Sequence, residues 1–262
     1  MKRIAACLLA LCALALPGAV RGQQITVAAA SDLTSAMGEL APGFERATGH
    51  KIKVSTGSSG NFFAQIQNGA PFDVFLSADV DYPRQLEAAG LIEPGSLYVY
   101  AIGRITVWAP SDSPLDVSQG WAAVTDARVR KIAIANPAHA PYGRAAEAAM
   151  RSAGVYDRVA GKLVLGENIS QAAQFVDSGN ADIGILALSL ASAANMKNRG
   201  RWWPIPENSY PRLEQAAVVL RSSRNQDVAR AFLAYLQSAE GRAILQRHGL
   251  SEAPRAAAAS RP

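Results

Sequence analysis

Hydrophobic and polar positions along this chain predict short strands that are each followed by a helix. The apolar run 25–30 has the length of a buried strand, and the following stretch, 33–48, repeats its apolar residues at helical spacing. The first part of the chain contains three such pairs, which are 25–30 with 33–48, 51–55 with 61–68, and 74–78 with 82–89. Strands that alternate with helices form a mainly parallel sheet whose faces the helices cover.

A second series of strands and helices follows two β-rich runs, 97–101 and 104–108, on either side of Gly103. Its expected pairs are 131–135 with 144–154, 163–165 with 169–178, and 183–186 with 190–197. The chain then returns to a strand at 216–220 and closes with helices at 226–237 and 239–248. This late strand predicts two lobes that the chain enters twice, joined by hinge strands near 104–108 and 211–216.

We therefore expect an α/β protein of two lobes, each a mainly parallel sheet flanked by helices. Lobe 1 should span 24–104 plus 216–252, and lobe 2 should span 105–215. An alanine-rich stretch, 253–262, is expected to form a flexible tail. The roughly 240 residues that follow the first segment of the chain are enough to give both lobes a core.

The N-terminus has the order of a secretory signal peptide, with a basic start, the apolar run 4–16 and the small residues of 17–22. We expect this signal peptide to span 1–22 and to be removed. Cys7 and Cys12 both lie within it. The mature protein would then have neither a thiol nor a disulfide, so burial of the core must stabilise it.

The composition is that of a soluble globular protein, since 49% of the residues are hydrophobic and no second long apolar stretch follows the signal peptide. The formal net charge is +5, but Lys2, Arg3 and Arg21 belong to the signal peptide. The remaining charge is close to neutral, which disfavours a nucleic-acid partner. A lipoprotein is an alternative, although Leu11 stands before Cys12, where lipidation requires a small residue.

Three of the expected strand-to-helix turns, 28–34, 55–61 and 136–143, are rich in small, glycine or hydroxyl-bearing residues. Ligands of open α/β sheets lie beyond the carboxyl ends of the strands, where these turns are expected. The turns leave backbone N–H groups free and direct the positive ends of helix dipoles to one place. They predict an anion site that uses no charged side chain.

Each turn by itself has a simpler interpretation. Gly57-Ser58-Ser59-Gly60 could be an ordinary loop with a serine N-cap, and Ser31 or Asp32 could cap the first helix. The anion site is favoured because several such turns fall at the same ends of strands.

Four motifs of the chain resemble those of the periplasmic molybdate-binding proteins of ABC transporters. They are Ala29-Ala30-Ser31-Asp32-Leu33, Gly57-Ser58-Ser59-Gly60, the run 68–79, and Asn136-Pro137 followed by Ala140-Pro141-Tyr142-Gly143. The resemblance implies a two-lobed periplasmic binding protein fold, a location in the periplasm, and molybdate or tungstate as the ligand. It also implies a monomer that delivers this ligand to a membrane ABC permease, without a cofactor, a bare metal cation or enzymatic activity.

The same resemblance implies which residues bind the oxyanion. They are Ser31 with the adjacent backbone amide of Asp32, Ser59, Tyr142, and the backbone amide of Ile169. Some members have a tyrosine at the position of Ala187 in this chain. Tyr142 would therefore have to supply the hydroxyl here.

Asp32 conflicts with this ligand, because a carboxylate beside a dianion is repulsive. We expect only its backbone N–H to face the ligand, while its side chain caps the first helix at the N–H of Thr34 or Ser35. A site made only of donors disfavours oxyanions that carry a proton, such as hydrogen phosphate. Cavity size would have to exclude the smaller sulfate.

Two other classes of function stay open. One is a secreted hydrolase that uses Ser31 or Ser59, with His139 as the one histidine near the expected cleft; however, the sequence has no Gly-x-Ser-x-Gly motif. The other is a binding protein for sulfate, phosphate or an organic acid. Arg144 could clamp an organic acid, but it could also be an exposed residue at the start of a helix.

Overall fold

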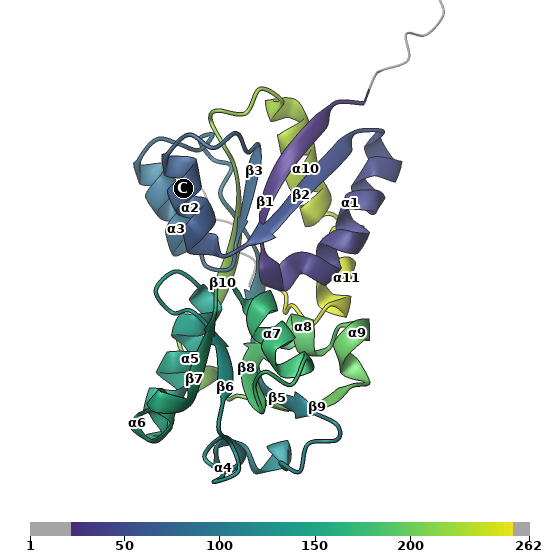
Figure 1. Ribbon diagram of the computed structural model, residues 1–262. Coiled ribbons are helices and arrows are strands. Elements are labelled where there is room, and N and C mark those ends of the chain that lie inside the picture. The colour runs from purple at the N-terminus through teal and green to yellow at the C-terminus, as the bar shows by residue number, and fades with distance from the viewer. Residues whose placement is uncertain (1–21, 254–262) are drawn as a thin grey trace, which may run out of the picture.

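A computed structural model describes residues 22–253 and has two lobes, one above the other in Figure 1, each built on a five-stranded sheet. The two-lobed α/β fold expected from the sequence is thereby confirmed. The expected signal peptide, apart from Gly22, and the expected tail, apart from Ala253, lie outside the described residues. Within residues 22–253, no helix is long and apolar enough to cross a membrane.

The sheet of lobe 1 has the strand order β2-β1-β3-β10-β4. β1 pairs in parallel with β2 and β3, whereas β10 is antiparallel to both β3 and β4. Of these strands, therefore, only β10 runs in the opposite direction. The strands are β1 (Gln24–Ala30), β2 (Lys51–Gly57), β3 (Val74–Ser77), β4 (Tyr98–Gly103) and β10 (Leu213–Val219).

Helices cover both faces of this sheet, as Figure 1 shows, because its central strands are apolar on both sides. Phe44 and Phe232 pack edge to face on one side, with ring centroids 5.4 Å apart, and Phe62 packs with Phe75 and Leu86 on the other. The helices are α1 (Thr34–Thr48), α2 (Ser59–Gln67), α3 (Asp81–Ala88), α10 (Gln226–Gln237) and α11 (Ala239–Arg247).

The sheet of lobe 2 repeats this plan with the order β7-β6-β8-β5-β9, in which β5 alone runs against its neighbours. The sequence pattern did not predict β9, because Pro204 and Pro206 bound its two tryptophans; an edge strand tolerates proline at its end. The strands are β5 (Ile105–Pro110), β6 (Ile132–Ala135), β7 (Leu163–Gly166), β8 (Ile183–Ala187) and β9 (Gly200–Pro204).

The helices of lobe 2 include two short ones, α4 and α6, that the sequence pattern also did not predict. The expected helix 190–197 is interrupted in the structure, where α8 and α9 occupy this part of the chain. The helices are α4 (Trp121–Val124), α5 (Pro141–Ser152), α6 (Tyr156–Val159), α7 (Ile169–Asp177), α8 (Leu188–Ala191) and α9 (Ala194–Lys197).

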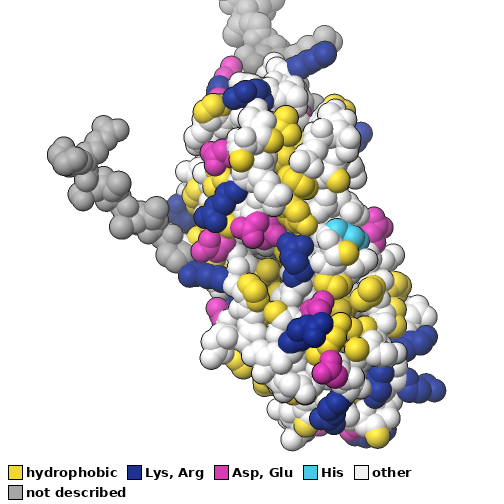
Figure 2. Space-filling model, turned by 90° about the vertical axis from the view of Figure 1, so that its left-hand side faces the viewer, with side chains coloured by type: hydrophobic (Ala, Val, Ile, Leu, Met, Phe, Trp, Pro, Cys, Tyr) yellow, Lys and Arg dark blue, Asp and Glu magenta, His cyan; other side chains and the backbone are white. Residues whose placement is uncertain are grey.

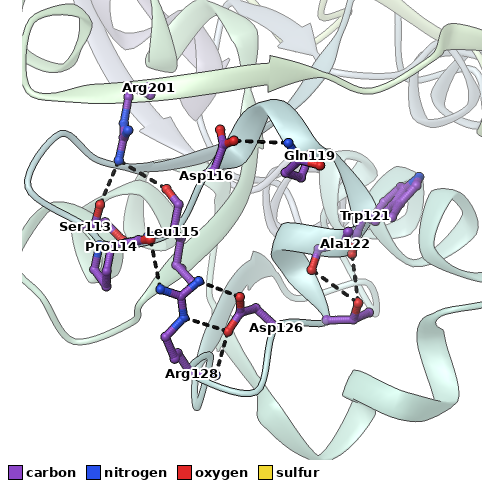
Figure 3. A network of polar contacts seen from close by, with 11 residues as sticks. Ser113, Pro114, Leu115, Asp116, Gln119, Trp121, Ala122, Asp126, Arg128 and Arg201 are labelled. Carbon is purple, nitrogen blue, oxygen red and sulfur yellow. Dashed lines mark hydrogen bonds and ion pairs between the residues drawn. The ribbon is translucent and has the colours of Figure 1, made fainter.

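Side chains that bond to backbone carbonyls hold the long segment between β5 and β6, which Figure 3 shows from close by. Arg201 of β9 donates to the carbonyl oxygens of Ser113 at 2.7 Å and Leu115 at 3.1 Å. Arg128 pairs with Asp126 at 2.7 Å, and this guanidinium lowers the pKa of Asp126. These bonds tie down the irregular parts of the segment, on either side of the short helix α4.

The chain passes from lobe 1 to lobe 2 between β4 and β5 and returns between β9 and β10. The parallel strands of each lobe end close to the other lobe. Their carboxyl-terminal turns, which the sequence had marked as rich in hydroxyl and glycine residues, therefore meet between the lobes.

Gly200 and Gly38 form a matched pair for testing how tightly lobe 2 is packed. A Cβ at Gly200 would overlap the indole ring of the fully buried Trp108, whereas a Cβ at Gly38, in the exposed face of α1, meets no atom within 4 Å. Gly200→Ala should lower the free energy of unfolding by about 1–3 kcal/mol. Gly38→Ala should raise it by about 0.5–1 kcal/mol. Urea denaturation measures both, and equal effects would contradict this packing.

Candidate functional site

A small cavity lies between the lobes, where strands β1 and β2 end and helices α2, α5 and α7 begin. The five residues expected to bind a ligand all belong to its wall, and each exposes 3% or less of its surface. Whether they bind a ligand stays a prediction. The wall consists of Ala30, Ser31, Asp32, Gly57, Ser58, Ser59, Ala78, Ala140, Pro141, Tyr142, Asn168 and Ile169.

Two hydroxyl groups of the wall keep a hydrogen that they can donate. The Oγ atom of Ser59 accepts the backbone N–H of Ala78 at 2.9 Å, and the Oγ atom of Ser31 accepts that of Ser170 at 3.4 Å. Each bond orients a hydroxyl without using its hydrogen. Ser59 and Ile169 are also the first residues of α2 and α7, where backbone N–H groups have no partner within the helix.

Tyr142 and Asp32 meet across the cavity wall. The Tyr142 hydroxyl donates to Oδ2 of Asp32 at 2.9 Å. The side-chain amide of Gln215 donates to the same Oδ2 at 2.6 Å and to the Tyr142 hydroxyl at 2.8 Å. Tyr100 completes this network by donating to Oε1 of Gln215 at 2.7 Å. The network joins α5 of lobe 2 to three elements of lobe 1.

The expectation that the Asp32 side chain caps the first helix was wrong. Neither the short 3-10 helix η1 (Ser31–Leu33) nor α1 has a side-chain cap. Asp32 lies inside η1, one residue before Leu33, which is the N-cap of α1. Its carboxylate accepts hydrogen bonds from Tyr142 and Gln215 instead of from the backbone of α1. Ser58 does occupy the N-cap position of α2, but its hydroxyl makes no capping bond and donates instead to the carbonyl oxygen of His139 at 2.6 Å.

Burial raises the pKa of Asp32 to about 6, although the hydrogen bonds from Gln215 and Tyr142, and the nearby backbone N–H of Asp32 itself, act in the opposite direction. The pKa values of Tyr142 and Tyr100 are also raised, chiefly by burial and next by the charge of Asp32. Both tyrosines therefore stay protonated. Among the described residues of the wall, Asp32 is the one whose charge can change near neutral pH.

Further contacts hold the two lobes together around the cavity. The backbone carbonyl oxygen of His139 accepts the N–H of Gly60 at 2.9 Å and the Ser58 hydroxyl at 2.6 Å. Arg144 of α5 forms an ion pair of 2.5 Å with Asp79, which follows β3 of lobe 1, and its guanidinium also donates to the Tyr82 hydroxyl at 3.2 Å. Arg144 thus bridges the lobes at the rim instead of lining the cavity.

Other candidate residues have structural positions. Ala187 ends β8 and is buried, and it does not belong to the cavity wall. His139 binds Ser58 next to the wall, with 2.9 Å between its Nδ1 and the serine Oγ. In the part of the chain that the structure describes, no group of three or more His, Cys, Asp or Glu residues could hold a metal ion.

The sequence analysis missed Gln215 and Tyr100. Gln215 is fully buried in β10, next to the apolar run 216–219. A polar residue in a buried strand position needs hydrogen-bond partners, so its place in the run 213–219 was a usable signal. Tyr100 gave no such signal, because tyrosine is common in strands.

Asp32→Asn tests whether this carboxyl titrates in the folded protein. Because the pKa of Asp32 is raised in the folded protein, the free energy of unfolding of the wild type falls as the pH rises from 4 through about 6. The asparagine variant has no such group, so its free energy of unfolding does not fall for this reason. Relative to wild type, the free energy of unfolding of the variant should therefore increase by about 2 kcal/mol between pH 4 and pH 8. Denaturation of the ligand-free proteins measures it. Asp112→Asn, at an exposed position, is the control, and a pH-independent difference for Asp32→Asn would contradict the titration.

Comparison with known proteins places this geometry in a family. Residues 25–251 match the family described as bacterial extracellular solute-binding protein. The molybdate-binding protein ModA of Azotobacter vinelandii is 37% identical over 231 residues, covering 88% of this chain and 91% of that protein. The molybdate-binding protein ModA of Rhodobacter capsulatus is 37% identical over 236 residues, covering 90% of each chain.

A solved structure agrees with these sequence relatives. The periplasmic molybdate-binding protein of Azotobacter vinelandii superposes with a TM-score of 0.83 at 33% sequence identity, covering 88% of this chain and all of that one. Because the family match runs through nearly all described residues, this chain belongs to the bacterial extracellular solute-binding proteins.

Proposed function

We propose that this protein captures molybdate, or the chemically similar tungstate, between its lobes and delivers it to a membrane ABC permease. The observation that carries the proposal is the small cavity between the lobes. Its wall offers hydroxyl and helix N-terminal donors and, among the described residues, includes no lysine or arginine. Relatives named as molybdate-binding proteins, 37% identical to this chain, support the choice of ligand.

The proposed ligand contacts come from both lobes. In lobe 1 they are the Ser31 hydroxyl, the backbone amide of Asp32, and Ser59. In lobe 2 they are the Tyr142 hydroxyl and the backbone amide of Ile169. Because neutral dipoles that are already oriented lose little free energy on reorganisation, they can hold a dehydrated dianion without a cation.

The donor set favours an anion that carries no proton of its own. Hydrogen phosphate would leave its proton without an acceptor, which costs binding free energy. Sulfate has the charge and shape of molybdate but is smaller, so the size of the cavity has to distinguish them. The same argument predicts little discrimination between molybdate and tungstate.

The rest of the proposal concerns the state and the partners of the protein. We propose a periplasmic monomer without cofactor or enzymatic activity, whose lobes span 24–104 plus 216–252 and 105–215. The second boundary falls within β10, whose first residues, 213–215, already pair with β4 in the sheet of lobe 1. Closure of such lobes around a hinge would be the signal that the permease recognises. Basic and acidic side chains are mixed on the face that Figure 2 shows, which fits a protein without a nucleic-acid partner.

Calorimetric titration of the mature protein tests the ligand directly. Molybdate and tungstate should bind with similar affinity and a stoichiometry of one, while sulfate should bind at least tenfold more weakly and phosphate should give no signal. Tight binding of sulfate with no heat from molybdate would overturn the assignment. Hydrolysis of ester substrates by the purified protein would instead support the secreted hydrolase.

Gly60→Ala tests whether closure of the lobes supports binding. A Cβ at Gly60 would lie 2.5 Å from the carbonyl oxygen of His139 and 2.6 Å from the Tyr82 hydroxyl. The variant should bind molybdate about 5- to 150-fold more weakly, since such overpacking costs roughly 1–3 kcal/mol. Its unfolding midpoint without ligand should be little changed, because the overlap with His139 lies between the lobes, whose separation relieves it, and alanine suits α2. Gly38→Ala is the control, and an unchanged affinity of Gly60→Ala would refute the role of this contact.

A further inference from the structure

The Tyr142 hydroxyl has one hydrogen, and two acceptors compete for it. In the structure this hydrogen is donated to Oδ2 of Asp32. The proposed function requires the same hydrogen to reach an oxygen of the bound anion. A hydroxyl can donate one hydrogen and accept through two lone pairs, so it cannot serve an ionised Asp32 and the anion together.

A proton on Oδ2 of Asp32 resolves this competition. The O–H group of a neutral Asp32 can donate to the Tyr142 oxygen over the same 2.9 Å. The direction of the hydrogen bond is then reversed, and the tyrosine hydrogen is free to turn to the anion. Gln215 keeps both of its bonds in this arrangement, because each of its amide hydrogens still finds a lone pair.

The second oxygen of the carboxylate also favours a neutral group. Oδ1 of Asp32 is buried and has no hydrogen-bond partner among the described residues. A buried ionised carboxylate normally has hydrogen-bond donors at both oxygens. The carbonyl oxygen of a neutral carboxyl group carries less charge, so it costs less free energy to leave it without a donor. The site is thus built to bind one oxygen of Asp32 firmly and to leave the other without a donor.

The groups that face Asp32 provide no cation to balance its charge. Tyr142 of α5, Gln215 of β10 and Tyr100 of β4 surround the side chain. Helix α8 approaches through Ser189, whose hydroxyl donates to the backbone carbonyl oxygen of Asp32. From α7, Ser170 donates to the backbone carbonyl of Ser31. No lysine, arginine or histidine of the described chain shifts the titration of Asp32.

Two basic side chains lie nearby but are bonded to other groups. Arg144 forms its ion pair with Asp79 at the rim, and the His139 ring bonds to Ser58. An ionised Asp32 beside a bound dianion would therefore enclose three negative charges without a counter-charge. Neutralising Asp32 leaves only the two charges of the ligand, which the oriented dipoles can hold.

We propose that capture of the dianion takes up one proton at Asp32, with Gln215 as the residue that positions the carboxyl against Tyr142. This inference rests on the proposed function. The proton comes from solvent, binds Oδ2 of Asp32, and releases the Tyr142 hydrogen to the ligand; no other bond forms or breaks. Gly103 makes the arrangement possible, because a Cβ there would overlap the Tyr142 hydroxyl and lie 2.8 Å from Nε2 of Gln215.

Proton uptake gives the affinity a definite pH dependence. In the free protein burial raises the pKa of Asp32 to about 6, and the bound dianion raises it further. Affinity should therefore be nearly constant below pH 6 and should fall about tenfold for each pH unit above it. Molybdate itself stays a dianion above pH 6, so the ligand does not contribute to this slope.

Calorimetry in buffers of different ionisation enthalpy counts the protons that binding takes up. Titration of the full mature protein with sodium molybdate at pH 7.5 should give an uptake close to one proton per bound ion, and at pH 5 close to zero. Saturable binding with no proton uptake at pH 7.5 would overturn this inference while leaving the proposed function standing. Absence of saturable binding at both pH values would overturn both.

Two variants identify the group and its positioning residue. Asp32→Asn, which has no carboxyl to protonate, should bind without proton uptake and without the loss of affinity above pH 6. Asp112→Asn, at an exposed position, is the control and should keep an uptake close to one. Equal uptake by Asp32→Asn and wild type would assign the proton to another group and overturn the inference.

Gln215→Met separates positioning from packing. Without the amide donor, ionised Asp32 is less stabilised, so the pH above which affinity falls should move upward by at least half a unit. A side chain that only fills space would leave this pH profile unchanged, and an unchanged profile would overturn the role of Gln215. Should the variant not fold, the buffer comparison on the wild-type protein still decides the proton uptake.

Discussion

The hydrogen bond from Tyr142 to Asp32 crosses from lobe 2 to lobe 1 at the wall of the cavity. It joins the two halves of the site at the point where an anion would lie, and it depends on Gln215 of the returning strand β10. A carboxylate in this place is costly because burial opposes its charge. The position of the tyrosine hydroxyl and the charge of the site are therefore linked through one contact.

This contact becomes possible through the topology of the two sheets. The chain leaves lobe 1 after β4 and returns to it with β10, so these two strands lie side by side next to the passage between the lobes. Gly103 ends β4 and leaves space for the Tyr142 hydroxyl. Closing the lobes thus completes both the polar network and the cavity, which explains why Gly60, Arg144 and His139 meet partners across the same boundary.

Selection of an anion by neutral groups follows from the same arrangement. Helices α2, α5 and α7 begin at the cavity, and the Ser31 and Ser59 hydroxyls are oriented by backbone N–H groups that they accept. These donors are fixed before a ligand arrives, which is the condition under which dipoles can replace water around a dianion. A cationic side chain in the wall would also attract organic acids, so its absence from the described lining residues narrows the range of ligands.

The sequence by itself determined the alternation of strands and helices, the two lobes, and the turns at which the site lies, because apolar periodicity and hydroxyl-rich turns are local properties of the chain. The resemblance of its motifs to those of a known family indicated Ser31, Asp32, Ser59, Tyr142 and Ile169, and the structure brings these five residues into one cavity wall. Only the tertiary structure decided where the Asp32 side chain points. Its partners Tyr142 and Gln215 are 110 and 183 residues away along the chain, and local capping preferences carry no information about donors that folding brings from such a distance.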